Sequence, residues 1–280
     1  MCRRDAGASA RAGRYSGWHR TCKANSDAGR HHNQNQPEAG IQDLYANSRR
    51  IVSAQTAPHP DLLDILARHR ASAYRRPYAA HSLRAYASLR EWLSRRGRQP
   101  LILDSGCGTG ASTLQVAVAR PDASVVGIDQ SRERLQRGGL ADADIAVLAP
   151  NAVLLRAPLE DLWRLLAADR VRLQRHLLWY PNPWPKAAQL RLRWHGHPVF
   201  PALLELGGEI ELRSNWQVYV DEFAQALAAC GWQTERAEIG MDAVAASPFE
   251  RKYRDSGHRL WRLIGRPRGN TMQDGSRCEY

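Results

Sequence analysis

The sequence predicts an α/β fold, a doubly wound and mostly parallel sheet preceded by a helical N-terminal extension. From residue 101 onward, short apolar runs alternate with helical segments, which is the order that builds such sheets. A glycine-rich turn joins the first apolar run to the first of these helices. Hydrophobic residues make up 43% of the chain, which is enough for a sizeable core.

Residues 1–40 are expected to form a disordered basic tail, and residues 268–280 a flexible C-terminal tail. The first segment is rich in Ala, Gly, Ser, Asn, His and Arg and holds almost no aliphatic residues, so it cannot bury a core. No apolar stretch follows its basic start, which argues against a secretory signal. A misassigned start codon and an RNA-contacting tail both stay open.

Residues 41–98 are expected to form a helical, basic region. The stretch PHPDLLDILARH carries apolar residues near helical spacing after a proline. In HSLRAYASLREWLSRR, the expected apolar face is Leu83, Tyr86, Leu89 and Leu93, and arginines occupy the other faces. One face of this helix can therefore pack against the following domain while its arginines meet solvent or phosphate.

Residues 99–267 are expected to form the α/β domain. Its five successive strands are predicted from the runs LILD (101–104), SVVGID (124–129), AVLLRA (152–157), HLLWY (176–180) and EIELRS (209–214). Helices are predicted after each of the first three strands and after the fifth, the second capped by Ser131 and the last ending at Gly231. Two late runs, WQTERAEI and HRLWRLIG, also have strand character.

The balance of charge favours a polyanionic partner. The formal net charge is +12, and the only lysines are Lys23, Lys186 and Lys252. Such an excess suits the neutralisation of nucleic-acid phosphates, although a bias of the genome toward arginine codons would also produce it. No basic amphipathic helix and no run of roughly 20 apolar residues stands out, so a membrane partner is not expected.

Five cysteines are present without a CxxC pair, which indicates free thiols in a reducing compartment and hence a cytoplasmic protein. His195 and His197 form an H-x-H pair with no further ligands nearby in the sequence. No metal site is therefore expected.

The turn LDSGCGTG carries the first signs of a ligand site. Asp104 ends the first strand, and Gly106, Gly108 and Gly110 follow it. Such glycines let the backbone and a helix N-terminus approach a ligand closely. The spacing G-x-G-x-G differs from the G-x-G-x-x-G of dinucleotide sites, and the acid before it suits a ligand with a cationic amino-acid end.

Asp129 ends the second strand, one strand–helix–strand step after Asp104. A carboxylate at that position can accept hydrogen bonds from both hydroxyls of a ribose. Together the two acids suit S-adenosylmethionine, with Asp104 toward the methionine end. The arrangement resembles the Rossmann-like class I methyltransferases; the alternative is a tight turn beside an unrelated aspartate.

Three further motifs narrow the resemblance. PNPWPK (181–186) resembles the P-D-P-W-x-K motif of the bacterial tRNA (guanine-N7)-methyltransferase family. SNWQVY (214–219) resembles its T-D-W-x-x-Y motif, and SPFER (247–251) followed by Gly257-His258 resembles its closing T-x-F-E-x-R-G-H. The resemblance covers roughly residues 100–265 and implies a divergent member of that family.

The resemblance also implies roles for individual residues. Asp104, Asp129 and the glycine turn would bind S-adenosylmethionine, and Pro158 falls where the family often has a third cofactor-side acid, for which Glu160 or Asp161 can substitute. Asn182 replaces an aspartate where cofactor and base meet and is the expected catalytic residue. Residues expected to contact the substrate are Lys186, Asn215, Ser247, Phe249 and Glu250.

Asn182 is the departure with the largest chemical consequence. Guanine N7 carries a lone pair and no hydrogen, so its methylation needs orientation and close approach rather than a general base. Asparagine keeps an acceptor oxygen, adds a donor and loses the negative charge of aspartate. Asn-Pro before an aromatic residue also resembles the N-P-P-Y loop of exocyclic-amine methyltransferases, so amine chemistry stays open. Trp184 is a candidate to stack on the base, or a packing residue.

The expected function is direct transfer of a methyl group from S-adenosylmethionine to a guanine N7 in tRNA. Two alternatives stay open: a divergent paralogue that methylates another RNA base or a small molecule, and a catalytically decayed RNA-binding protein. The oligomeric state, monomer or homodimer, and the target nucleotide are not determined by the sequence.

Overall fold

The computed structural model describes residues 48–141 and 143–268. The expected tails, residues 1–40 and 268–280, lie outside the described residues apart from residue 268. Among the described helices, none is long and apolar enough to cross a membrane. The division into a helical region and an α/β domain stays a prediction, because both parts share one hydrophobic core.

The described residues form one eight-stranded sheet in the order β3-β4-β2-β1-β5-β6-β8-β7. Five neighbouring strands, β4, β2, β1, β5 and β6, pair in parallel, and the other pairings are antiparallel. The strands are β1 (Leu101–Ser105), β2 (Ser124–Asp129), β3 (Ile145–Ala149), β4 (Ala152–Arg156), β5 (Arg175–Trp179), β6 (Glu209–Ser214), β7 (Trp232–Glu238) and β8 (Trp261–Pro267). The predicted mostly parallel sheet is confirmed.

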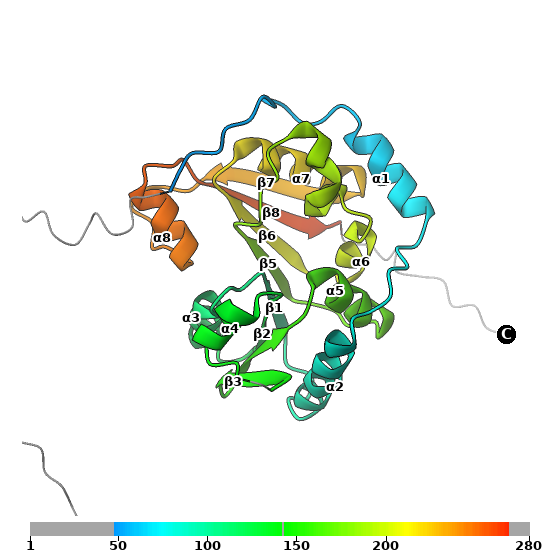
Figure 1. The fold of residues 1–280 in the computed structure, drawn as a ribbon, viewed down its shortest axis with the longest axis vertical. Helices are drawn as coiled ribbons and strands as arrows, with labels where there is room; N and C mark the ends of the chain where they lie inside the picture. The colour runs from blue at the N-terminus through cyan, green and yellow to red at the C-terminus, as the bar shows by residue number, and fades with distance from the viewer. Residues whose placement is uncertain (1–47, 142, 269–280) are drawn as a thin grey trace, which may run out of the picture. The chain divides into compact units, whose positions relative to one another are not determined.

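Helices cover both faces of this sheet (Figure 1). They are α1 (Leu62–Ala71), α2 (Ala80–Ser94), α3 (Ala111–Ala119), α4 (Arg132–Arg137), α5 (Leu159–Ala168), α6 (Phe200–Glu205), α7 (Gln217–Ala229) and α8 (Pro248–Asp255). Two short 3-10 helices, η2 (Ala187–Leu192) and η3 (Trp194–Gly196), follow β5. The larger core joins α1, α2, α5, α6 and α7 to one face of the sheet, and a smaller core joins α3 to the other.

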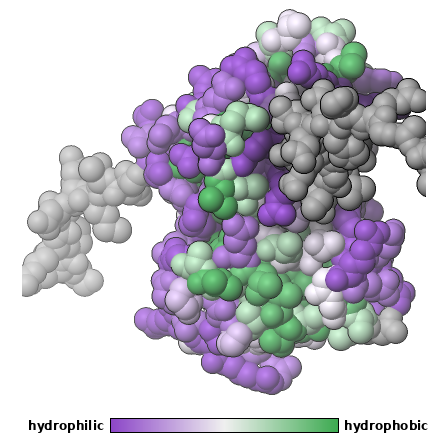
Figure 2. Space-filling view, turned by 90° about the vertical axis from the view of Figure 1, so that its left-hand side faces the viewer, coloured by the Kyte–Doolittle hydropathy of each residue, from purple (hydrophilic) through white to green (hydrophobic). Residues whose placement is uncertain are grey.

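Strand residues alternate between these two cores. Leu103, Val126 and Val153 belong to the larger core, whereas Ile102 and Val125 face α3 in the smaller one. This alternation is what a sheet buried on both sides requires. Figure 2 shows the side on which α3 and α8 lie, where apolar residues gather in the lower part. Val118 of α3 is 73% exposed.

The face of α2 differs from the prediction at one position. Tyr86 and Leu89 are buried as expected, but Leu83 is 47% exposed. The neighbouring Ser82 is buried instead, and its hydroxyl donates to Asp161 Oδ2 at 2.8 Å. Because this hydrogen bond fixes the rotation of the first turn against α5, Leu83 points to solvent. The prediction for Leu83 was wrong.

The strand order of the parallel part of the sheet reverses at β1. β2 and β4 lie on one side of it, and β5 and β6 lie on the other. In α/β sheets, ligands bind beyond the carboxyl ends of the strands at such a reversal. A ligand site is therefore expected among the residues that follow β1, β2 and β5.

Candidate active site

The turn after β1 is a compact loop that only glycine can form. Gly106, Gly108 and Gly110 have φ angles of 84°, 61° and 80°, a region that side chains with a Cβ rarely adopt. The backbone N–H groups of Gly106 and Cys107 donate to the carbonyl oxygen of Ile128 at 2.8 and 3.0 Å. The loop is thus tied to the end of β2.

Asp104, at the end of β1, is buried next to this loop and hydrogen-bonded to the start of α3. The residue is 2% exposed, and its Oδ2 accepts hydrogen bonds from Ser112 Oγ and Thr113 Oγ1, both at 2.7 Å. Burial raises the pKa of the Asp104 carboxyl, although the two hydroxyl donors oppose that shift. The carboxyl group therefore joins the end of β1 to the first turn of α3.

Asp129 links the glycine loop to the loop after β2. Its Oδ2 accepts from the backbone N–H of Gly108 at 2.9 Å, and its Oδ1 accepts from the backbone N–H of Ser131 at 2.7 Å. Arg134 lies 3.5 Å from the same carboxylate. The two predicted acids thus bound one glycine loop from both sides.

Two adjoining pockets open at the carboxyl ends of β1, β2 and β5. One, of about 260 Å³, lies between the glycine loop and α8 and is called the α8 pocket here; its lining includes Asp104, Gly108, Ser247, Phe249 and Lys252. The other, of about 210 Å³, lies under the loop after β5 and is called the Asn182 pocket; its lining includes Asp129, Glu160, Tyr180 and Asn182. Gly106, Arg134 and Trp179 line both.

The loop after β5 is held in an unusual backbone conformation. Tyr180 and Trp184, which flank the segment PNP, have φ angles of 55° and 45°, which cost energy in residues other than glycine. The Tyr180 hydroxyl donates to Glu250 Oε2 at 2.9 Å. This conformation leaves the Asn182 side chain exposed at the pocket, where its Oδ1 accepts from the Trp184 N–H at 3.5 Å.

A buried arginine, itself in an ion pair, holds the loop after β5 through hydrogen bonds to its carbonyl oxygens. Arg193 is fully buried, and its guanidinium donates to the carbonyl oxygens of Trp184 at 3.0 Å and Lys186 at 3.2 Å. Its Nη1 also forms an ion pair with Glu222 at 2.5 Å. Burial alone would raise the pKa of Glu222, but the hydrogen bonds and charges of His195 and Arg193 hold it at about 2.

Residues before α1 also form hydrogen bonds with this loop and with the ion pair of Arg193 and Glu222. Ser53 Oγ donates to the carbonyl oxygen of Pro185 at 2.5 Å. Gln55 donates to Glu222 Oε1 at 2.6 Å and accepts from Arg193 Nη2 at 2.9 Å. The N-terminal extension therefore fixes the loop after β5 as well as packing on the sheet.

Of the remaining predicted residues, some line a pocket and others do not. Ser247 caps α8 by accepting from the Glu250 N–H at 3.1 Å, and both Ser247 and Phe249 line the α8 pocket. Glu250 itself is fully buried, where it forms an ion pair with Arg213 at 2.8 Å. Glu250 therefore orders α8 and the loop after β5 without lining either pocket.

Three other predicted residues do not line the two pockets. Asn215 Nδ2 lies 3.0 Å from Nδ1 of His258 in a hydrogen bond, and Lys186 is exposed at the start of η2. Pro158 precedes α5, where the next acid, Glu160, lines the Asn182 pocket. Asp161, the other proposed substitute, is buried and accepts from Ser82 instead.

Sequence reasoning overlooked Trp179. The indole ring lines both pockets, and the Arg213 guanidinium lies 4.9 Å from its centroid. Its Nε1 is buried without a hydrogen-bond partner among the described residues. Its position as the last residue of β5 could have identified it as a site residue, since the carboxyl ends of parallel strands carry ligand-facing side chains. Arg134, Arg137 and Lys252, which bring positive charge to the α8 pocket, were also missed.

Comparisons with known proteins agree with this arrangement. A tRNA (guanine-N(7)-)-methyltransferase of Pseudomonas aeruginosa is 28% identical over 177 residues, which cover 60% of this chain and 71% of that protein. A protein of the same name from Paraburkholderia xenovorans is 29% identical over 198 residues, covering 64% of this chain and 70% of that one.

Solved structures of 16S rRNA and antibiotic-resistance methyltransferases are also similar to this chain. The methyltransferase KamB aligns with a TM-score of 0.46 and 17% identity, covering 68% of this chain and 94% of that one. The methyltransferase Kmr aligns with a TM-score of 0.45 and 22% identity, covering 66% and 93%.

A family model described as "Putative methyltransferase" matches residues 98–263. This match covers more than half of the chain and includes the glycine loop, the loop after β5 and α8. The chain therefore belongs to this family, as a divergent S-adenosylmethionine-dependent methyltransferase distantly related to the tRNA (guanine-N7)-methyltransferases.

Proposed function

We propose that the protein methylates N7 of a guanine in tRNA. The observation that carries the proposal is the meeting of three elements around two adjoining pockets: the glycine loop with Asp129, the loop that presents Asn182, and α8 with Ser247 and Phe249. Two of these elements, the loop that presents Asn182 and the start of α8, hold motifs that resemble the guanine-N7 family. Relatives at 28–29% identity bear the name of that activity.

The residues at the glycine loop fit S-adenosylmethionine. A Cβ at Gly106 would meet no atom within 4 Å, so the loop borders open space where the two pockets adjoin. Asp129 and Glu160 offer carboxylate oxygens for ribose hydroxyls in the Asn182 pocket. Asp104, which lines the α8 pocket, would face the methionine end. When bound, S-adenosylmethionine supplies an electrophilic methyl group.

The remaining residues position the acceptor base. Trp179 offers a flat apolar wall between the two pockets, which suits stacking with a purine taken out of its helix. Asn182 offers an acceptor and a donor at the Asn182 pocket. Since N7 has no proton to remove, orientation by these two side chains is sufficient chemistry for a direct transfer. The cytoplasm is the proposed location, where tRNA is available.

Replacing Asp129 with asparagine is expected to weaken S-adenosylmethionine binding by about 10-fold, roughly the strength of one charged hydrogen bond. Asparagine has one acceptor oxygen, so it keeps the hydrogen bond from only one of the two N–H groups of Gly108 and Ser131. A loss of stability of about 1–3 kcal/mol is therefore expected as well, and the affinity is measured at a temperature where the variant is folded. Calorimetric titration measures the affinity. Asp122→Asn, on the exposed turn before β2 and outside the lining of both pockets, is the control. Wild-type affinity in Asp129→Asn would remove Asp129 from the cofactor site.

Replacing Asn182 with aspartate is expected to preserve or raise the rate of N7 methylation. The restored carboxylate offsets the positive charge that develops on the purine, and the exposed position accepts the charge without burial. Single-turnover kinetics with a tRNA transcript measure the effect. A complete loss of activity would instead show that the amide is needed, as for an exocyclic-amine acceptor.

The direct test is methyl transfer from labelled S-adenosylmethionine to total tRNA, followed by nucleoside analysis. The proposal predicts label in 7-methylguanosine. Label in another nucleoside would favour the divergent-paralogue alternative. If calorimetry detects no S-adenosylmethionine binding at tens of micromolar and no label appears, the decayed RNA-binding alternative holds.

A further inference from the structure

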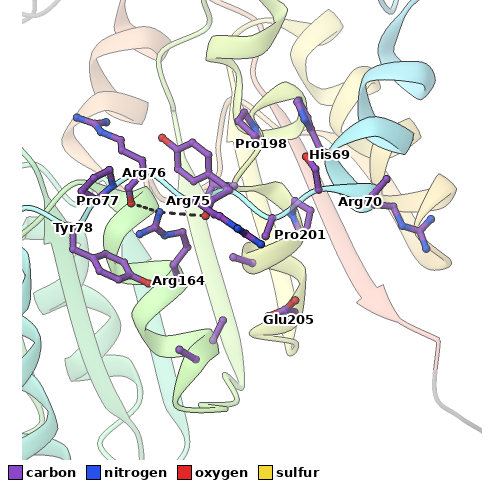
Figure 3. Close-up of a pocket in the computed structure, with 18 residues that line it drawn as sticks. His69, Arg70, Arg75, Arg76, Pro77, Tyr78, Arg164, Pro198, Pro201 and Glu205 are labelled. Carbon is purple, nitrogen blue, oxygen red and sulfur yellow. Dashed lines mark hydrogen bonds between the residues drawn. The ribbon is translucent and has the colours of Figure 1, made fainter.

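A second cavity, larger than either active-site pocket, lies between α5 and α6. Its volume is about 660 Å³, and residues 69–78, at the end of α1 and in the connection to α2, form one wall. Arg164 and Ala167 of α5 and Pro201 of α6 form the opposite side. Figure 3 shows these elements facing one another around open space. This cavity is called the α5–α6 groove below.

Positive charge dominates the α5–α6 groove. Its lining includes Arg70, Arg75, Arg76 and Arg164 against one acidic residue, Glu205. Arg70 and Arg75 are exposed, and neither forms an ion pair with any residue that the structure describes. In Figure 3, Arg75 extends into the space between α5 and α6, whereas Arg70 lies at the far end of the groove. Among the residues that the structure describes, none is an ion-pair partner for the Arg75 guanidinium, which reaches into the groove.

Arg164 gives the groove a fixed wall. Its Nη1 donates to the carbonyl oxygen of Arg76 at 2.6 Å and to that of Tyr74 at 3.4 Å, the dashed lines in Figure 3. Its guanidinium also lies 4.0 Å from the centroid of the Tyr78 ring and 5.2 Å from that of Tyr74. The segment that carries Arg75 is therefore held to α5 at several points, which gives the exposed arginine a defined place.

The groove and the Asn182 pocket meet at one ion pair. Arg76, which lines the groove, lies 2.9 Å from Glu160, which lines the Asn182 pocket. Glu160 and Arg164 are one helical turn apart on α5. The groove and the Asn182 pocket therefore lie next to each other at the start of α5.

We propose that the α5–α6 groove binds the phosphate backbone of the RNA that flanks the target nucleotide, with Arg75 as a phosphate contact. This inference rests on the proposed function, because it takes RNA to be the substrate. Arginine suits the role, since its planar guanidinium matches the geometry of a phosphate group. Contacts of this kind fix the register of a nucleic acid without reading its sequence.

Salt-dependent binding of a tRNA transcript to the full-length chain tests the proposal. Arg75→Glu is expected to raise the dissociation constant about 10-fold near 100 mM salt and to lower the log–log salt slope by about 1, the contribution of one phosphate contact. Arg75→Lys retains the charge and should stay close to the wild type. Affinity for S-adenosylmethionine should be the same in all variants.

Arg98→Glu is the matched control, with the same change of charge. Arg98 is exposed just before β1, at the edge of the sheet opposite the pockets, so a small effect is expected there. An equal effect of the two substitutions would show only the influence of net charge and would overturn the proposal. Wild-type affinity and slope in Arg75→Glu, with tRNA still methylated, would overturn it while leaving the proposed function intact. Absence of tRNA binding and methylation by the wild type would instead reject the proposed function.

Discussion

Arg193→Met is expected to destabilise the protein by about 3–5 kcal/mol and to abolish methyl transfer. The loss of one partner leaves an uncompensated buried charge, and breaking buried ion pairs in this way costs that much. Here Glu222 would remain fully buried and would lose Arg193, one of the two partners that lower its pKa. The carbonyl oxygens of Trp184 and Lys186 would also lose their donor, which releases the strained loop that presents Asn182.

Urea denaturation measures the first effect, and methyl transfer at a temperature where the variant is still folded measures the second. The matched control is Arg191→Met, an exposed arginine on η2 two residues before Arg193, which should change stability by less than about 0.5 kcal/mol. Adding Glu222→Gln to Arg193→Met should recover part of the lost stability, because the buried charge is removed. A destabilisation of Arg193→Met below about 1 kcal/mol would contradict the bracing role.

Trp179→Ala is expected to lower kcat/KM for tRNA by about 10–100-fold. Stacking of a base on an aromatic side chain contributes about 1–3 kcal/mol, and each 1.4 kcal/mol corresponds to roughly a factor of ten. The indole lies where both pockets meet, so its removal deletes the wall against which the base would lie. Arg213, which packs on the ring, keeps its ion pairs with Glu211 and Glu250.

The readout separates base stacking from cofactor binding. Affinity for S-adenosylmethionine should change by less than about 3-fold, and Trp179→Phe, which keeps a ring, should retain most of the activity. If Trp179→Ala methylates tRNA at the wild-type rate, the indole is only a packing residue. If both variants lose cofactor affinity equally, the ring belongs to the cofactor site.

The sequence predicted most of the sheet because its central strands are buried on both sides. Such strands appear as uninterrupted apolar runs, as in SVVGID for β2 (Ser124–Asp129). β3 (Ile145–Ala149) was missed because it is a short edge strand, only partly buried and paired antiparallel with β4 after a tight turn. Its residues do not alternate between apolar and polar, and strand predictions depend on that alternation.

The candidate site was predicted where backbone chemistry determines the residue type. Positive φ angles demand the glycines at 106, 108 and 110, and the end of β2 fixes the position of Asp129. The direction of a polar side chain is set by tertiary contacts instead. Arg193 counts toward the positive charge that favours a polyanionic partner, yet it is buried against Glu222. Glu250 likewise turns to Arg213, 37 positions away, a partner that no local pattern indicates.

The chemical identity of the acceptor atom is the central claim, and one substrate tests it directly. A tRNA transcript made with 7-deazaguanosine has a C–H group in place of N7 and therefore no lone pair at that atom, while the other groups of guanine are unchanged. The protein is expected to transfer labelled methyl groups to the ordinary transcript and none to the 7-deaza transcript, although both bind with similar affinity. Equal labelling of the two transcripts would contradict methylation at N7 and assign the reaction to another atom of the RNA.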